Sequence, residues 1–125
     1  MLAPEPLRGL RVVADPAVLD AVVAALPAQS TTFRFAPDEA LVVGIASLRL
    51  DEADAIVEDE SGFVAIRVER AVVELHTDWA IPTERGAFAQ GAIAGVPAKL
   101  AFLPDGQAMV VVYASYADEL VERLR

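Results

Sequence analysis

His76 is the only histidine of the chain, and histidine is a frequent general base and metal ligand. No cysteine, second histidine or serine-based nucleophile motif accompanies it. We therefore interpret His76 as a partly exposed helix residue without a chemical role. The sequence predicts no catalytic residue, and it leaves open a small enzyme that uses carboxylates as the least favoured hypothesis.

Acidic residues are the densest group of potential ligands. They gather between Asp51 and Glu60, where carboxylate oxygens are of the type that binds Ca²⁺ or Mg²⁺. Their spacing does not match a calcium-binding loop, and strand alternation would place Glu58 and Glu60 on one face and Asp59 on the other. We therefore predict no metal site, and a solvated acidic rim that would attract a basic partner surface.

Gly86, Gly91 and Gly95 invite comparison with a phosphate-binding loop. They lack the Gly-x-Gly-x-x-Gly spacing, no Lys-Ser/Thr pair follows them, and the segment leads into a strand instead of a helix N-terminus. The sequence therefore predicts that these glycines serve loops and strand bends, and it predicts no bound cofactor.

Composition limits the possible partners. A net charge of −9, with 10 basic residues scattered among 19 acidic ones, argues against binding to nucleic acid or to an anionic membrane. The absence of cysteine excludes disulfides and zinc-thiolate sites, and together with an N-terminus unlike a signal peptide it leads us to expect a cytoplasmic protein. A hydrophobic content of 55% predicts a buried interface, and hence a homo-oligomer or a bound partner.

The spacing of apolar residues predicts the helices that would position these residues. Between residues 16 and 26 apolar side chains recur at intervals of three and four, after Asp15 as the N-cap. The same spacing predicts a helix over residues 70–80. A third helix would begin with Ser115 as its N-cap and Asp118 as a weak capping-box partner.

Alternation and turn residues predict the strands. In residues 63–69, Phe63, Ala65 and Arg67 share one face, and Val64, Ile66 and Val68 share the other. The expected strands cover residues 7–14, 31–36, 40–50, 55–59, 63–69, 88–94, 98–103 and 107–113.

Together these elements predict an α+β fold, with an antiparallel or mixed sheet and about three helices packed on one side of it. We expect residues 1–125 to form a single domain, because a chain of this length can bury one core. Residues 1–6 are expected to be a flexible N-terminal tail.

The last third of the chain carries a family resemblance. It contains Gly91–Pro97 in an apolar strand and kink, a turn at Pro104-Asp105-Gly106, and a helix that starts with Ser115-Tyr116-Ala117-Asp118. This order resembles the C-terminal end of the gamma subunit of heterotetrameric sarcosine oxidase. That subunit is related to the folate-binding domain of aminomethyltransferase, the glycine-cleavage T-protein. Residues 55–81 and 35–43 resemble earlier parts of the same family.

The resemblance implies half of a T-protein-like domain that holds no flavin or nicotinamide itself. Where larger relatives carry an acidic residue, this chain reads Gly95–Lys99 without a carboxylate, so folate chemistry is not implied. Typical gamma subunits carry tryptophan and arginine in the terminal helix, where this chain has Glu119, Val121 and Glu122. A stand-alone paralogue is therefore also open.

We predict a non-catalytic accessory or scaffolding subunit that binds flavoprotein oxidase subunits or a second copy of itself. The alternative is a module that binds a small, folate-like ligand. The residues expected at an interface are Tyr113, Tyr116, Leu120, Glu58 and Glu60.

Overall fold

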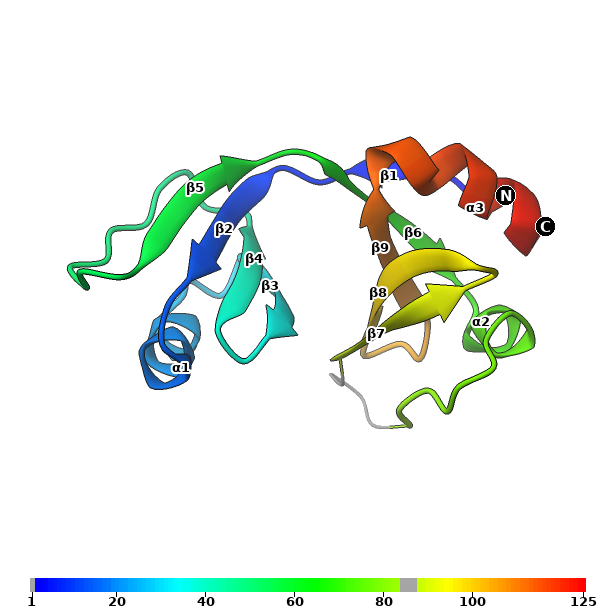
Figure 1. Ribbon diagram of the computed structural model, residues 1–125, viewed down its shortest axis with the longest axis horizontal. Coiled ribbons are helices and arrows are strands. Elements are labelled where there is room, and N and C mark those ends of the chain that lie inside the picture. The colour runs from blue at the N-terminus through cyan, green and yellow to red at the C-terminus, as the bar shows by residue number, and fades with distance from the viewer. Residues whose placement is uncertain (1, 84–87) are drawn as a thin grey trace. The chain divides into compact units, whose positions relative to one another are not determined.

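The computed structural model describes residues 2–83 and 88–125. The chain folds as two compact units (Figure 1). Unit 1 combines the two ends of the chain, before Leu7 and after Ser61, and unit 2 comprises Leu7–Ser61. Each unit has its own sheet and its own hydrophobic core. The expectation of a single domain over residues 1–125 stays a prediction.

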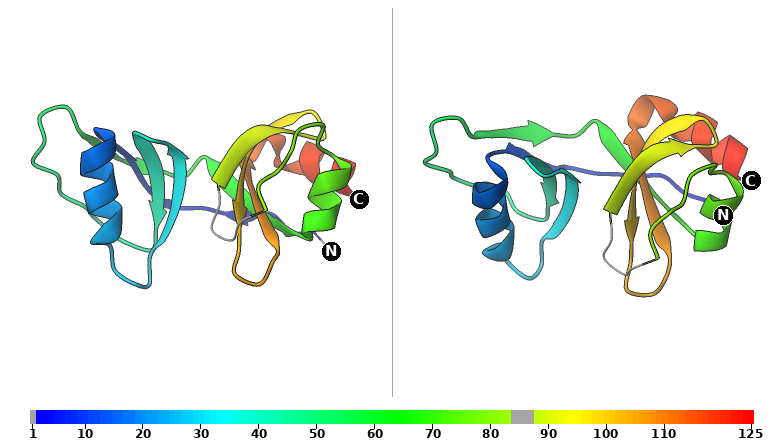
Figure 2. Two further views of the ribbon diagram at one scale, coloured as in Figure 1. Left: turned by 90° about the horizontal axis from the view of Figure 1, so that it is seen from below. Right: turned by 60° about the horizontal axis from the view of Figure 1, so that its bottom comes forward.

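Unit 2 is a four-stranded antiparallel sheet with a helix on one face (Figure 2). The strand order is β3-β4-β2-β5. The strands are β2 (Gly9–Val13), β3 (Thr31–Ala36), β4 (Glu39–Val43) and β5 (Ile56–Glu60), and the helix is α1 (Pro16–Ala24).

Helix α1 matches the prediction closely. Pro16 occupies its first turn, and the carbonyl oxygen of Asp15 accepts the first intrahelical bond, from the Leu19 amide at 2.9 Å. The Asp15 side chain makes no capping bond. The predicted apolar stripe packs against the core, which contains Leu10 and Val12 of β2 and Val42 of β4.

Strand β4 is shorter than predicted. It ends at Val43 because Gly44 has a φ of 100°, a left-handed conformation that only glycine adopts easily. The rest of the expected strand, from Ile45 to Leu50, is irregular, and Ile45, Leu48 and Leu50 are half-buried against the core of unit 2. Its apolar character therefore reflects packing and not strand pairing.

Unit 1 is a five-stranded antiparallel sheet with the order β1-β6-β9-β8-β7. The strands are β1 (Glu5–Pro6), β6 (Phe63–Val68), β7 (Phe88–Ile93), β8 (Val96–Phe102) and β9 (Ala108–Tyr113). Its helices are α2 (Arg70–Leu75), the 3₁₀ turn η1 (Ala114–Tyr116) and α3 (Ala117–Leu124).

The core of unit 1 lies on one face of this sheet. Val64, Ile66 and Val68 of β6 belong to it and share one face of the strand, as their alternation predicted. Val73 of α2 and Leu120 of α3 pack into the same cluster, so both helices cover this face. The opposite face carries the residues between these core positions, among them Phe63 of β6, Lys99 of β8 and Tyr113 of β9.

The expected N-terminal tail is partly ordered. Glu5 and Pro6 pair with Ala65 and Val64 of β6, and Leu2 is half-buried against the core of unit 1. The sequence did not indicate this pairing, because a two-residue strand that contains proline has no recognisable pattern.

Two helix predictions need correction. Helix α2 ends at Leu75, so Trp79 is not helical; its indole nitrogen donates to the Ala92 carbonyl at 2.9 Å instead. Ser115 is not an N-cap, because it lies within η1, and Tyr116 precedes the first residue of α3 without a side-chain cap bond.

The predicted fold class is confirmed: the described residues form an α+β fold of antiparallel strands with about three α-helices. The division into two sheets was not predicted. Within the parts of the chain that the structure describes, no helix is long and apolar enough to cross a membrane.

Candidate functional site

Two tyrosines are exposed where β9 leads into α3. Tyr113 ends β9 and is 54% exposed, and Tyr116 ends η1 and is 37% exposed. The Ala114 amide between them donates to the Gly62 carbonyl at 2.8 Å, which ties this turn to the chain just before β6. We call Tyr113 and Tyr116 the tyrosine surface.

The ring of Tyr113 is held in place by Phe63. The two residues are cross-strand partners of β9 and β6, and their rings stack with centroids 4.6 Å apart and an interplanar angle of 20°. Phe63 is only 5% exposed, so it supports the more exposed tyrosine from behind. Tyr113 is thus a preorganised aromatic anchor.

Leu120 does not belong to this surface. It is fully buried in the core of unit 1, together with Ala117, Val121 and Leu124 of the same helix. The helical repeat turns these positions to the sheet and leaves the acidic positions of α3 in solvent. Leu120 is therefore a core residue, and its expected place at an interface is not available to it in this fold.

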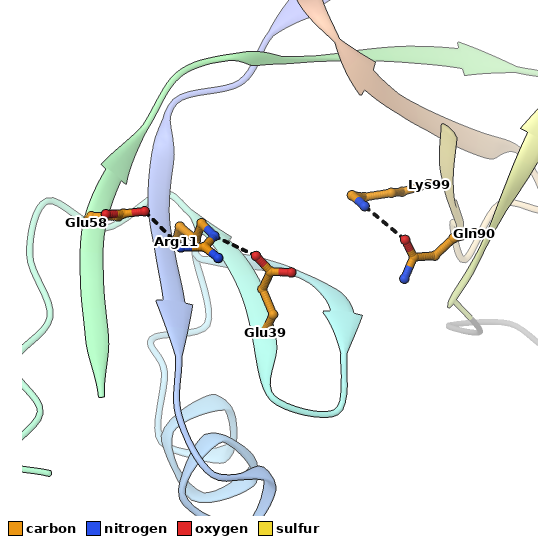
Figure 3. A network of polar contacts seen from close by, with 5 residues as sticks. All are labelled: Arg11, Glu39, Glu58, Gln90 and Lys99. Carbon is orange, nitrogen blue, oxygen red and sulfur yellow. Dashed lines mark hydrogen bonds and ion pairs between the residues drawn. The ribbon is translucent and has the colours of Figure 1, made fainter. Parts of the chain in front are cut away.

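Glu58 is part of an ion-pair network in unit 2 (Figure 3). Arg11, its cross-strand partner on β2, donates from Nη1 to Glu58 Oε1 at 2.9 Å and from Nε to Glu39 Oε2 at 2.5 Å. The hydrogen bond to Glu39, followed by the one to Glu58, raises the pKa of the Arg11 guanidinium. Arg11 is shared by two carboxylates, so the charge of Glu58 is partly compensated within the unit, which weakens it as an attractor for a basic partner.

Glu60 and Asp59 follow the predicted alternation. Glu60 lies opposite Gly9 and shares a face of β5 with Glu58, whereas Asp59 lies opposite Leu10 on the other face. Among residues 2–83 and 88–125, no group of three or more histidine, aspartate or glutamate side chains is arranged to hold a metal ion.

His76 has a structural position. It follows the last residue of α2, and its carbonyl oxygen accepts a hydrogen bond from the Ala94 amide at 2.8 Å. Ala94 and Gly95 form the two-residue turn between β7 and β8, with φ values of 50° and 79°. The backbone of His76 thus anchors this hairpin to α2.

Gly91 has a role that the sequence did not indicate. The Trp79 indole lies against it so closely that a Cβ atom on Gly91 would come within 2.6 Å of the ring. Gly91 is thus a site of close approach and not a simple strand bend. Gly86, which was grouped with it, lies outside the described residues.

A groove of about 380 Å³ lies in unit 1. We call it the Lys99 groove, because Lys99 on β8 is the only lysine of the chain. Its Nζ donates to Oε1 of Gln90, the cross-strand partner on β7, at 3.0 Å (Figure 3). The groove is lined by Phe63, Gln90, Gly91, Ala92, Pro97, Ala98, Lys99, Val111, Val112 and Tyr113. Sequence reasoning missed the groove, although the uniqueness of Lys99 was a signal.

Comparison with solved structures shows a likeness in fold, whereas comparison with sequences does not. Neither a protein-family model nor a curated protein sequence matches this chain. The fold is similar to a chain of the heterotetrameric sarcosine oxidase from Corynebacterium sp. U-96, solved in complex with pyrrole 2-carboxylate, with a TM-score of 0.77. The two share 14% sequence identity, and the match covers 99% of this chain and 80% of that chain. At this identity the likeness establishes the fold alone.

Proposed function

We propose that this chain is a non-catalytic accessory subunit, similar to the gamma subunit of heterotetrameric sarcosine oxidase, that acts through protein–protein contacts. The observation that carries the proposal is the fold match to a chain of that enzyme, which covers 99% of this chain. Subunits of such an assembly bury part of their surface against one another. The partner that we propose is a flavoprotein oxidase subunit, and a second copy of this chain is the alternative.

We propose that the tyrosine surface is the anchor of this contact. Tyrosine is enriched among the residues that dominate binding energy, because it buries a large area with few rotatable bonds. Tyr113 is supported by Phe63 and loses little further freedom on binding. The exposed Asp118 follows in the first turn of α3, whereas Glu119 beside it pairs with Arg123. A partner with a basic residue next to an apolar pocket would therefore fit.

The test is co-purification of the tagged protein from its native cells, with the flavin absorbance of the recovered material as the readout. We expect the wild type to recover a flavoprotein, and a Tyr113→Ser/Tyr116→Ser double variant to recover about ten-fold less or lower still. Leu75→Ser is the matched control, because Leu75 is an apolar side chain of α2 that is 82% exposed. This control should recover as much flavoprotein as the wild type.

Three results would each contradict a part of the proposal. A wild-type protein that returns without any flavoprotein would refute the proposed partner, and a light-scattering mass of 13.3 kDa at all concentrations would also exclude self-association. Equal recovery by the wild type and the double tyrosine variant would refute the anchor while leaving the accessory role standing.

A further inference from the structure

The Lys99 groove has the features of a binding site for a small anion with an aromatic ring. Phe63, Lys99, Gln90 and Tyr113 alternate with core residues along their strands, so they share the sheet face opposite α2 and α3. We propose that this groove binds a small planar aromatic carboxylate. The proposal goes beyond the accessory role and concerns the isolated chain, in which Tyr113 belongs both to the groove and to the tyrosine surface.

The apolar part of the groove offers a ring a place to stack. One face of Tyr113 is stacked on Phe63, yet the residue remains 54% exposed. Ala92, which shares this face of the sheet with Gln90, has a small side chain and leaves room in the groove beside the tyrosine. A planar aromatic ligand could therefore continue the stack of Phe63 and Tyr113, an arrangement that aromatic rings favour.

The polar part of the groove favours an anion. Lys99 carries a donor-only ammonium group, and Gln90 turns its side-chain oxygen toward that ammonium. None of the described residues that line the groove is an aspartate or a glutamate, although the chain as a whole has a net charge of −9. A carboxylate would form a charge-assisted hydrogen bond with Lys99, which is stronger than a bond between neutral groups.

Register fixes the spacing of the two parts. Lys99 lies opposite Val111 on β9, and Tyr113 is two residues further along β9 on the same face. Such diagonal neighbours are about 7–8 Å apart, which suits a ring stacked on the tyrosine with its carboxylate at the lysine. A volume of about 380 Å³ is near the lower end of ligand pockets and suits one or two rings.

The experiment is a titration of the full chain with 2-naphthoate, followed by ¹⁵N–¹H NMR. A ligand of this size that fits the groove should bind with a Kd on the order of 1 mM and shift the amide signals of Gly91, Ala92, Lys99 and Tyr113. The neutral 2-naphthamide and the non-aromatic cyclohexanecarboxylate are matched controls, and each should bind about ten-fold more weakly.

Variants separate this site from a general effect of charge. Lys99→Met should weaken naphthoate binding about ten-fold. Arg67→Met is the control, because Arg67 is a cation on the same face of the sheet that pairs with Asp105 and does not line the groove. It should bind naphthoate like the wild type. Circular dichroism of both variants confirms that they are folded.

The uniqueness of Lys99 provides a second readout. An amine-selective acetylating reagent can modify no other side-chain amine than that of Lys99, and peptide mass spectrometry distinguishes this product from acetylation of the N-terminal amine. Naphthoate should slow acetylation of Lys99 and leave the N-terminus unaffected. The proposal is overturned by shifts that do not saturate about ten-fold above the expected Kd, by shifts outside the groove, or by equal binding of Lys99→Met and the wild type.

Discussion

Replacement of Gly91 by alanine is expected to destabilise unit 1, because the added methyl group would occupy space that the Trp79 indole already fills. A Cβ on Gly91 would lie 2.6 Å from Cε2, 2.7 Å from Cζ2 and 2.8 Å from Nε1 of Trp79. Contacts below 3.0 Å are essentially never seen for real Cβ atoms, so the ring must move away from the strand. The same ring donates to the Ala92 carbonyl and packs against the core of unit 1.

The magnitude follows from three contributions. Overpacking costs about 1–3 kcal/mol, and loss of the Trp79–Ala92 hydrogen bond costs about 0.5–1.5 kcal/mol. Alanine also reduces the conformational entropy of the unfolded chain, which offsets about 0.4–1 kcal/mol of this destabilisation. We therefore expect Gly91→Ala to lower the free energy of unfolding by about 2 kcal/mol, a large part of the ~5–15 kcal/mol that is usual for a domain.

Trp79 reports on its own displacement, because it is the only tryptophan. Denaturant unfolding followed by tryptophan fluorescence should show a lower midpoint for Gly91→Ala and a red-shifted emission of the folded state. Gly106→Ala is the control: Gly106 has a φ of 86° and nothing within 4 Å of its Cβ position. That variant should lose about 1 kcal/mol to backbone strain and keep the native emission.

A double-mutant cycle decides whether the indole is the cause. In a Trp79→Ala background the clash is absent, so adding Gly91→Ala should leave the free energy of unfolding almost unchanged. Unfolding is followed by circular dichroism in this background. The reasoning is refuted if Gly91→Ala costs the same in both backgrounds, or if the folded single variant has wild-type emission and stability.

Two further predictions concern the ion pairs and the cooperativity of folding. Arg11→Met should lower the free energy of unfolding by about 1 kcal/mol in low salt and less in high salt, whereas Arg49→Met should change nothing measurable, since Arg49 and its partner are almost fully exposed. The pKa of Arg11 is raised in the folded protein, so its stabilisation is fully present at any pH below the pKa of an unfolded arginine. The loss of unfolding free energy in Arg11→Met should therefore be constant across neutral pH. Val42→Ala, a core change in unit 2, should lower a single unfolding midpoint seen both by Trp79 in unit 1 and by circular dichroism; two separate transitions would contradict a single domain.

The reason to expect one transition lies in the connections between the units. Gly9 pairs with Glu60 in unit 2, and Pro6 pairs with Val64 in unit 1. Unit 1 is built from the segment before Leu7 and the segment after Ser61, and folding of unit 2 brings these two segments together. Folding of unit 2 therefore lowers the entropy cost of pairing β1 with β6.

Local pattern was enough to predict several parts of the molecule. The stripe of α1 and the division of the β6 residues between two faces followed from spacings of 3.6 and 2 residues, which depend only on backbone geometry. The placement of Glu58 and Glu60 on one face of β5 followed from the same rule. Tyr113 and Tyr116 are exposed and Leu120 is buried, and the place of the two tyrosines in an interface stays a prediction.

Long-range contacts decided what pattern could not. Trp79 continued a helical spacing, but it lies beyond the end of α2 and packs on Gly91 of strand β7. Strands β5 and β6 are separated by only Ser61 and Gly62, yet they belong to different sheets. Neither fact is visible in the local sequence, because each depends on partners that are distant along the chain.

The sequence by itself determined the fold class, most of the elements and the faces that each element buries, since these follow from periodicity, turn residues and composition. Only the tertiary structure decided that the strands form two sheets, that Glu58 pairs with Arg11, and that Lys99 and Gln90 meet beside Tyr113. The physical reason is register: which side chains become neighbours across a sheet depends on how distant strands align, and a shift of one residue would exchange every such pair.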